Sequence, residues 1–477
     1  MAYIQFLGAA GTVTGSKHLI NTSSDGDGKN GIQVLVDCGL FQGQKEWRER
    51  NWQQLPIPAN QIDAVILTHA HLDHCGWIPR LVKQGFKGPI FATAATIDLC
   101  GIILPDSGHL QEEDAAFYNK IKKSKHDPAL PLYTFDEAQA CMQYFQVARV
   151  GETKQLSPEL SFRFVRAAHI LGSCMAEVTV TTGGQSRLLL FTGDVGRVHD
   201  HTVAPGKVVH SGPPEGESAD VLVMESTYGN REHPKNDPRP ELATVIRQTV
   251  ERGGSIVVPA FAVERTQKFV FMLKELMESG QIPRLPVFCD SPMAIKAVEI
   301  YMKYESEYSD EARRLIEQYG SPLEWPGFTF AATADQSKKI NEVHYPTIII
   351  SSSGMVTGGR ILHHLAQRLP DPKNTILFIG FQAPGTRGFT IKSGAKEVKI
   401  FGDFVSIRAQ IAVFEQFSDH ADTSELLSWL RTFRGKPSNT YLVHGEAAAA
   451  SQLLDTMSKE LGWNVQIAEW MEKVPVQ

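Results

Sequence analysis

The chain has 477 residues, of which 42% are hydrophobic and 21% are charged. These fractions are typical of folded proteins and exclude disordered, collagen-like and coiled-coil chains, and the length predicts about three domain-sized units. The net charge of −6 does not attract nucleic acid by itself, so a nucleic-acid ligand would need local positive groups or metal ions.

Two further features favour a location inside the cell. No segment approaches the roughly 20 consecutive apolar residues that span a bilayer, and the start of the chain lacks the basic residues that precede the apolar part of a secretion signal. The six cysteines contain no CxxC pair, so we expect buried free thiols instead of a disulfide framework. We therefore expect a cytoplasmic protein that does not bind membranes.

Several short apolar runs end abruptly at clusters of polar, titratable residues. Runs of this kind, rich in Val, Ile and Leu, are typical of buried strands. The runs are residues 62–67, 162–166, 188–191, 221–223, 347–350 and 441–443. Because polar groups at the carboxyl ends of strands in layered α/β folds often converge, the pattern predicts one ligand-binding cleft.

The middle of the chain has a different pattern. A stretch rich in Pro, Gly, Glu and Ser at residues 210–220 is typical of a crossing between domains. After it, expected strands and helices alternate from residue 221 to residue 350, which predicts a parallel, doubly wound sheet. The tail adds a helix at 424–433, a strand at 440–443 and a helix at 447–461.

The segment THAHLDHCGW contains the strongest chemical signal. His69, His71, Asp73 and His74 are four ligand-type residues within six positions, directly after an expected strand. Alternate residues of an extended segment point the same way, so His69 and His71 can meet one metal ion while Asp73 and His74 meet a second. One histidine alone is usually a packing residue, but four such residues together favour a metal site.

This segment cannot complete two coordination shells, because a catalytic zinc ion takes about four ligands. The missing ligands must follow strands elsewhere in the chain. The candidates, each directly after an apolar run, are His169 in AAHILGS, Asp194 in FTGDVG and His444 in LVHGE.

The order of these residues, HxHxDH followed by separated His, Asp and His, resembles the metallo-β-lactamase superfamily. Asp37 in LVDCGLFQG matches the early acidic residue of that superfamily, which supports the metal ligands from behind. The resemblance implies a four-layer αββα sandwich. It also implies two ligand groups, namely His69, His71 and His169 for one ion and Asp73, His74 and His444 for the other, with Asp194 bridging.

About 180 residues separate Asp194 from the returning tail, at the place where β-CASP nucleases carry an inserted domain. Glu225 in MESTYG, His420 in FSDHAD and His444 in VHGE resemble the three β-CASP motifs. SSSGMVTGGRILHHL and GFQAPGTRG are also similar to bacterial and archaeal relatives of the mRNA 3′-end cleavage endonuclease. The resemblance implies a metallo-β-lactamase domain in residues 1–213 and 396–477, and a Rossmann-like β-CASP domain in residues 214–395.

The resemblance implies a zinc-dependent ribonuclease that uses two Zn²⁺ ions per chain to activate a hydroxide for attack on single-stranded RNA. His420 is expected to donate a proton to the leaving oxygen, and Glu225 to orient it. The expected catalytic residues are thus His420 and Glu225, together with Asp73 and Asp37. The sequence leaves open whether the ions are zinc or manganese and whether the chain forms oligomers.

Other features concern substrate contacts. Ser351, Ser352 and Ser353 follow an expected strand and could donate hydrogen bonds to a backbone phosphate, and His364 could contact a phosphate from the next helix. The segment GAAGTVTGSK, which ends at Lys17, lacks the order of a phosphate loop, so we expect a strand and a turn there and no nucleotide cofactor.

Three alternatives stay open at this point. A 5′-to-3′ exoribonuclease like ribonuclease J shares the architecture. A thioester or lactone hydrolase shares the metal fold but needs neither the Glu225 and His420 pair nor a large inserted domain. A non-catalytic RNA-binding scaffold would have lost metal ligands, whereas this sequence keeps all of them.

Overall fold

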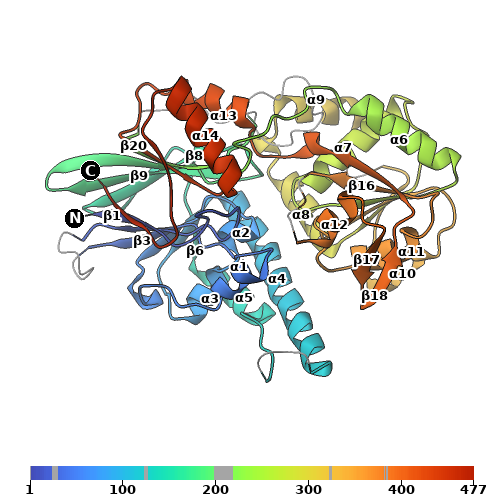
Figure 1. The fold of residues 1–477 in the computed structure, drawn as a ribbon, viewed down its shortest axis with the longest axis horizontal. Helices are drawn as coiled ribbons and strands as arrows, with labels where there is room; N and C mark the ends of the chain where they lie inside the picture. The colour runs from blue at the N-terminus through green and yellow to red at the C-terminus, as the bar shows by residue number, and fades with distance from the viewer. Residues whose placement is uncertain are drawn as a thin grey trace. The chain divides into compact units, whose positions relative to one another are not determined.

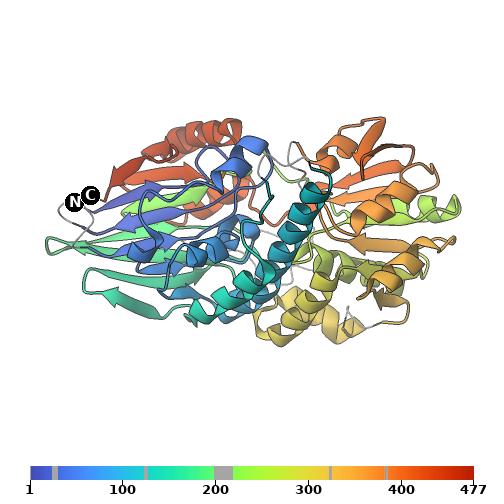
Figure 2. The ribbon, with the colours of Figure 1, turned by 90° about the horizontal axis from the view of Figure 1, so that it is seen from below.

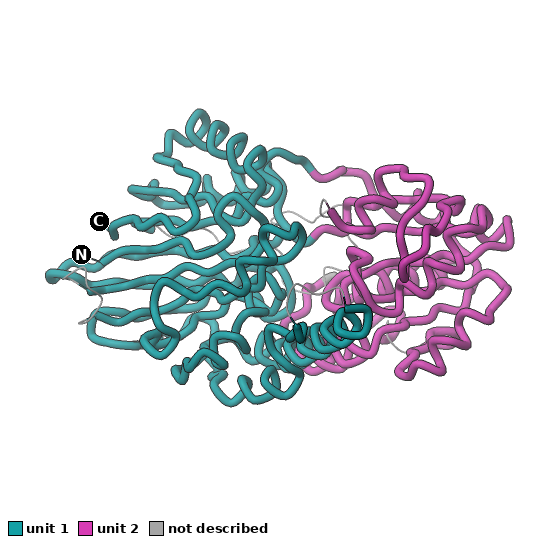
Figure 3. Tube along the Cα trace, turned by 60° about the horizontal axis from the view of Figure 1, so that its bottom comes forward, with its two compact units in different colours: residues 1–199, 212–232, 419–477 teal, residues 200–211, 233–418 magenta. Residues whose placement is uncertain are grey.

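The structure is a computed structural model that describes residues 2–23, 31–122, 127–197, 219–321, 325–380, 382 and 385–476. The chain divides into two compact units (Figure 3). Unit 2 is formed by His233–Ser418, and unit 1 is formed by described residues on either side of it. Among the helices of the described ranges, none is long and apolar enough to cross a membrane.

Unit 1 contains two seven-stranded sheets. The strands of the first sheet are β1 (Tyr3–Phe6), β2 (His18–Asn21), β3 (Gln33–Val36), β4 (Ala64–Ile66), β5 (Ile90–Ala92), β6 (Phe145–Val147) and β22 (Lys473–Pro475), in the order β22-β1-β2-β3-β4-β5-β6. β1 pairs antiparallel with β22, so the first and last strands of the chain are neighbours, and the two chain ends lie close together in Figure 2.

The second sheet carries most of the expected strands. Its members are β7 (Thr153–Ser157), β8 (Leu160–Arg166), β9 (Cys174–Thr182), β10 (Gln185–Phe191), β11 (Val221–Glu225), β20 (Asn439–Val443) and β21 (Val465–Ile467), in the order β21-β20-β11-β10-β9-β8-β7. β11 pairs parallel with both β10 and β20, which joins segments that are more than 200 residues apart in the sequence.

The two sheets pack face to face between two helical layers. One apolar core takes buried residues from both sheets, for example Ile66 of the first and Phe162 of the second. The helices are α1 (Lys45–Arg50), α2 (Leu72–Cys75), α3 (Ile78–Lys83), α4 (Ala94–Lys120), α5 (Phe135–Cys141), α13 (Thr423–Leu430) and α14 (Ala447–Glu460). α13 and α14 cover the second sheet, and α3, α4 and α5 lie beyond the first (Figure 1). The predicted αββα sandwich is confirmed.

Unit 2 contains a six-stranded, fully parallel sheet. The strands are β12 (Ile256–Pro259), β13 (Val287–Asp290), β14 (Phe328–Phe330), β15 (Ile348–Ser351), β16 (Thr375–Ile379) and β19 (Gln410–Phe414), in the order β14-β13-β15-β12-β16-β19. A separate antiparallel hairpin is formed by β17 (Glu397–Ile400) and β18 (Asp403–Ser406).

Helices cover both faces of this parallel sheet (Figures 1 and 2). They are α6 (Arg239–Glu251), α7 (Arg265–Glu278), α8 (Pro292–Lys303), α9 (Asp310–Tyr319), α10 (Ala334–Asn341), α11 (Ile361–Arg368) and α12 (Arg387–Lys392). Val258 faces the core under α6 and α7, whereas its neighbour Val257 faces the core under α10, α11 and α12. Burial on both faces explains why these strands are continuous apolar runs, and the doubly wound sheet is confirmed.

The compact units do not follow the predicted domain boundaries. The first predicted boundary, between residues 213 and 214, lies outside the described residues. β11 belongs to the second sheet of unit 1, because it pairs with β10 and β20, so the inserted unit begins later than expected. The predicted return at residue 396 is too early, because β19 pairs with β16 and the β17–β18 hairpin also lies within unit 2. The segment before Lys17 connects β1 to β2 without a strand of its own.

Candidate metal centre

The predicted metal ligands all lie in unit 1, in segments that begin at the ends of strands. His69 and His71 lie between β4 and α2, and Asp73 and His74 lie within α2. The other three follow β8, β10 and β20 and are His169, Asp194 and His444. Strand ends from both sheets therefore converge on one buried site, as the sequence predicts.

The first group of ligand atoms comprises three imidazole nitrogens and one carboxylate oxygen. His71 Nδ1 lies 3.2 Å from both His69 Nε2 and His169 Nε2. Asp194 Oδ2 lies 3.4 Å from the same two Nε2 atoms. These four atoms form one compact cluster that could hold a metal ion.

The second group lies beside the first and shares its carboxylate. His74 Nε2 lies 3.3 Å from His444 Nε2 and 3.2 Å from Asp194 Oδ1. Asp73 Oδ2 lies 3.4 Å from His444 Nε2. Asp194 thus turns one oxygen toward each group, which is the arrangement of a bridging ligand.

The spacing of these atoms fits metal coordination. Four ligands at about 2.0–2.1 Å from a tetrahedral zinc ion lie about 3.3–3.4 Å from one another, which is close to the separations in both groups. In addition, Asp194 Oδ1 is buried and has no well-aligned hydrogen-bond donor within the described part of the chain, although His74 Nε2 lies 3.2 Å away. A buried carboxylate oxygen without a donor is costly unless a cation occupies the space before it.

The electrostatics of the first ligand group also favour neutral histidines around a positive charge. Burial lowers the pKa of His71 to about 3 and holds the pKa values of His69 and His169 below their ordinary value, so these rings carry free lone pairs. Burial opposes ionisation of Asp194, but the surrounding histidines hold its pKa well below the usual range. The first ligand group is therefore prepared for a cation, because its carboxylate is charged and its imidazoles are not. In the second group, burial opposes protonation of His74, but the carboxylates of Asp194 and Asp37 hold its pKa well above the ordinary value.

Asp37 belongs to neither ligand group but contacts residues that support the ligands. One of its oxygens lies 2.7 Å from His74 Nδ1, and its carboxylate accepts hydrogen bonds from both the backbone N–H and the hydroxyl of Thr68. The Thr68 hydroxyl also lies 3.1 Å from His69 Nδ1. Partners of this kind fix the orientation of a ligating ring and increase its basicity.

Two supporting residues escaped the sequence analysis. They are Thr68 and Thr227, and the hydroxyl of Thr227 lies 3.1 Å from His444 Nδ1. Both lie within quoted segments, THAHLDH and MESTYG, but a threonine next to a ligand-type residue has no signature that distinguishes it from an ordinary strand-end residue.

The backbone at the site is constrained as well. Asp37, Ala168 and His444 have positive φ angles of 61°, 56° and 49°. Such left-handed conformations cost about 1–3 kcal/mol for residues other than glycine and persist where the surroundings fix them. His444 is held by a 2.7 Å hydrogen bond from its N–H to the carbonyl of Ala9.

His420 and Glu225 form a pair at the edge of the metal ligands. His420 Nδ1 lies 2.9 Å from Glu225 Oε2, while the other carboxylate oxygen accepts a 2.5 Å hydrogen bond from the Val195 N–H. His420 Nε2 lies 3.9 Å from Asp194 Oδ2, and the ring packs 4.6 Å from that of His169. Glu225 is fully buried, whereas His420 keeps a partly exposed edge.

The predicted substrate contacts lie in unit 2, at the end of β15. Ser351 is buried, and its hydroxyl donates to the carbonyl of Asp290, whereas Ser352 and Ser353 are half-exposed. His364 is completely buried, with Nδ1 2.7 Å from Asn341 Oδ1 and Nε2 2.7 Å from Asp290 Oδ2. These partners indicate that His364 joins α11 to the ends of α10 and β13 instead of contacting a phosphate.

Comparison with known families and proteins agrees with this geometry. The metallo-beta-lactamase superfamily model matches residues 28–91, the Beta-Casp domain model matches residues 266–391, and the model described as a Zn-dependent metallo-hydrolase RNA specificity domain matches residues 405–468. A crystal structure of a protein of unknown function from Enterococcus faecalis is 14% identical and aligns over 99% of both chains with a TM-score of 0.50, which is a likeness of fold alone.

Two curated relatives match over nearly the whole chain. Ribonuclease TTHA0252 of Thermus thermophilus is 34% identical over 470 residues, which cover 98% of this chain and 99% of the relative. Transcription termination factor FttA of Methanocaldococcus jannaschii is 30% identical over 465 residues, which cover 96% of this chain and 69% of the relative. With its sandwich fold, its inserted parallel sheet and its clustered ligands, the chain belongs to the β-CASP nuclease family of the metallo-β-lactamase superfamily.

Proposed function

We propose that this protein is a zinc-dependent ribonuclease that hydrolyses phosphodiester bonds of single-stranded RNA, chiefly as an endonuclease. The observation that carries the proposal is the position of His420, whose Nε2 lies 3.9 Å from Asp194 beside two groups of metal ligands. A relative that is 34% identical over nearly its whole length bears the name ribonuclease, which supports an RNA substrate.

The two ligand groups would hold two zinc ions, with Asp194 between them. When bound, the ions would supply Lewis-acid stabilisation of a phosphodiester and lower the pKa of a water molecule that serves as the nucleophile. The chain fixes the ligands for this task through Asp37, which holds His74, and through Thr227, which holds His444.

His420 is proposed as the proton donor to the leaving oxygen of RNA. The carboxylate of Glu225 accepts a hydrogen bond from the Nδ1–H of the ring, so Nε2 is the nitrogen that faces the metal ligands. Glu225 also stabilises the imidazolium form, and its second oxygen is fixed by the Val195 N–H. This is the division of labour of a general acid and its orienting carboxylate.

In unit 2, Ser352 and Ser353 are proposed to donate hydrogen bonds to the phosphate backbone of RNA. Both hydroxyls are half-exposed at the end of β15, and each is within 3.0 Å of another hydroxyl, Ser291 Oγ and Thr357 Oγ1 respectively. Hydroxyl clusters of this kind can redirect their donors to a phosphate oxygen.

Product analysis on a long, 5′-labelled RNA tests the proposal. An endonuclease releases internal fragments, whereas a 5′-to-3′ exonuclease releases labelled mononucleotides. Protein that carries zinc but cuts neither this RNA nor any other single-stranded RNA, while it hydrolyses a thioester, would overturn the assignment as a ribonuclease.

The six buried, free cysteines fit the reducing cytoplasm, which we propose as the location.

A further inference from the structure

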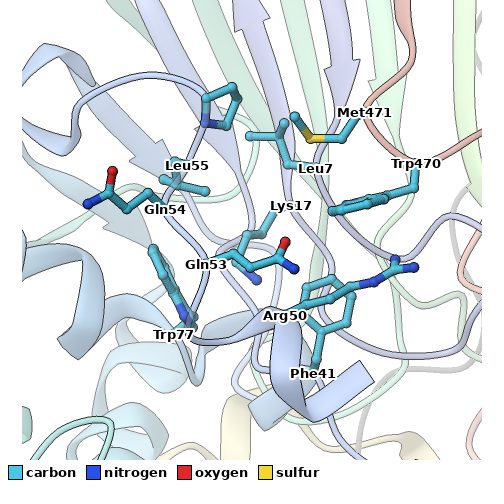
Figure 4. Close-up of a pocket in the computed structure, with 11 residues that line it drawn as sticks. Leu7, Lys17, Phe41, Arg50, Gln53, Gln54, Leu55, Trp77, Trp470 and Met471 are labelled. Carbon is cyan, nitrogen blue, oxygen red and sulfur yellow. The ribbon is translucent and has the colours of Figure 1, made fainter. Parts of the chain in front are cut away.

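A second concave site lies in unit 1, outside the metal ligands (Figure 4). It is lined by aromatic rings and cations from separate segments, and we call it the aromatic pocket, defined by Lys17, Phe41, Arg50, Trp77 and Trp470. Lys17 precedes β2, Arg50 ends α1, and Trp470 comes from the connection between β21 and β22. The pocket encloses about 350 Å³, its open mouth included.

The walls of the aromatic pocket are held by hydrogen bonds from a residue behind them. The side chain of Asn51 donates to the carbonyl of Phe41 at 2.7 Å and accepts from the N–H of Phe41 at 2.9 Å. The carbonyl of Asn51 accepts the indole N–H of Trp77 at 3.0 Å. The backbone that carries Phe41 and the indole of Trp77 are therefore held before any ligand arrives, which reduces the entropy cost of binding.

Lys17 places a buried cation on the wall of the pocket. Its side chain is 2% exposed, and its ammonium group lies 4.7 Å from the ring centre of Phe41 and 5.3 Å from that of Trp77. The ammonium donates to the carbonyl of Gly39, and no carboxylate pairs with it among the described residues. An ammonium has three donors, so a ligand with an acceptor oxygen would satisfy a group that the protein leaves incompletely paired.

Arg50 and Trp470 form the more exposed wall. The guanidinium of Arg50 lies 4.0 Å from the ring centre of Trp470 and 4.3 Å from that of Trp47. Trp470 remains 40% exposed, so it offers surface to a ligand. Planar guanidinium and indole groups are the surfaces on which unpaired nucleobases stack in single-stranded RNA complexes.

The aromatic pocket is connected to the metal centre through one residue. Ser16, the neighbour of Lys17, donates its N–H to the carbonyl of Asp73 at 2.8 Å, and its hydroxyl lies 3.5 Å from His74 Nε2. The carbonyl of Ser16 accepts the N–H of Gly39, whose own carbonyl accepts from Lys17. The pocket therefore lies within a few residues of the proposed site of cleavage, within the same compact unit.

We propose that the aromatic pocket binds one nucleobase of the RNA substrate, which stacks against Trp470 and Arg50 and accepts a hydrogen bond from Lys17 through a carbonyl oxygen. This inference rests on the proposed ribonuclease function. The two cations of the pocket suit an acceptor edge, and its aromatic planes suit a flat ring.

The first experiment measures binding without cleavage. The full chain is titrated calorimetrically with GMP, whose guanine carries a carbonyl oxygen. Trp470→Ala should weaken the affinity at least about fivefold, as expected for the loss of one stacking surface, and Lys17→Met about tenfold. Trp52→Ala is the matched control, because Trp52 is a 52% exposed tryptophan next to the pocket residue Gln53 but does not itself line the pocket. Thermal melts verify that each variant is folded.

The second experiment measures RNA cleavage. It tests whether the base that binds the pocket belongs to the RNA substrate or to a free nucleotide. With intact RNA, Trp470→Ala should raise KM at least about fivefold and leave kcat unchanged. In a series of RNAs that each lack one base, the RNA without the base that enters the pocket should have a higher KM than intact RNA with the unmodified protein. With Trp470→Ala, the two RNAs should have the same KM.

These results distinguish failure of the pocket from failure of the proposed function. If the protein cuts RNA but Trp470→Ala behaves like Trp52→Ala in both experiments, the pocket assignment is overturned. If GMP binding depends on Trp470 but no abasic position has an effect, the ligand is a free nucleotide and the RNA subsite is overturned. If no RNA is cut at all, the ribonuclease proposal fails by itself, whatever the calorimetry gives.

Discussion

His420 Nδ1 lies 2.9 Å from Glu225 Oε2, although the two residues are 195 positions apart in the sequence. The contact is fixed from both sides, because the N–H of Ala421 donates to the carbonyl of Val195 and the N–H of Val195 donates to Glu225. These hydrogen bonds hold the end of β11, which carries Glu225, against the segment that carries His420, beside the metal ligands.

This pair predicts non-additive effects on catalysis. We expect His420→Ala to lower kcat for RNA cleavage by about 10²–10⁴, since a general acid is lost, and Glu225→Gln to lower it less. The double variant should be no slower than His420→Ala alone, because Glu225 acts through the ring. Steady-state kinetics with metal analysis of each variant tests this. The exposed His109 supplies the control variant, His109→Ala. Independent, multiplicative losses would contradict the orienting role of Glu225.

Removal of metal should reduce both activity and stability. Chelation leaves the charged Asp194 facing an empty space, so we expect RNA cleavage to stop and the melting temperature to fall. Restoring free zinc to 100 times its Kd should return about 2.7 kcal/mol per site to the free energy of unfolding. Elemental analysis should find two ions per chain in the unmodified protein and fewer in His71→Ala. A chelated protein that melts unchanged would argue against metal binding at these ligands.

Asp37 should control metal affinity without contacting RNA. Asp37→Asn removes the charge that orients His74 and weakens the acceptor for the Thr68 hydroxyl, so we expect zinc affinity to fall about 10–100-fold. Competition with a chromogenic chelator measures this affinity directly. At saturating zinc the variant should regain much of its cleavage rate. A loss of cleavage with unchanged zinc affinity would instead indicate a direct role in the chemistry.

Lys17 should cost the protein stability. Burial lowers the pKa of Lys17 from 10.5 to about 8, so the unfolded chain binds the proton more tightly than the folded chain does. The penalty is fully present below pH 8 and disappears as the pH rises toward 10.5. We expect Lys17→Met to raise the free energy of unfolding at pH 7 by on the order of 3 kcal/mol. Urea denaturation at pH 7 and pH 10 checks this, and a gain that does not shrink at pH 10 would refute it.

The sequence by itself predicts which side chains cluster at the candidate metal centre, because these residues lie at strand ends with strong local signals. His69 and His74 lie in one compact motif, and Asp194 and His444 each follow a continuous apolar run. The residue after a strand lies at an edge of the sheet, whichever strands are adjacent. These ligands could therefore be assigned to one centre before the order of the strands was known.

Features that depend on which strands and helices are neighbours are decided only by the tertiary structure. β11 resembles the strands of unit 2 in its apolar run, yet its pairing with β10 and β20 places it and Glu225 in unit 1. In the same way, the partners of His364 become visible only when β13 and α11 meet, and the aromatic pocket exists only because Trp470 folds back onto Arg50. The physical reason is that apolar periodicity is set by nearest neighbours in the sequence, whereas sheet pairing and burial are set by contacts between distant segments.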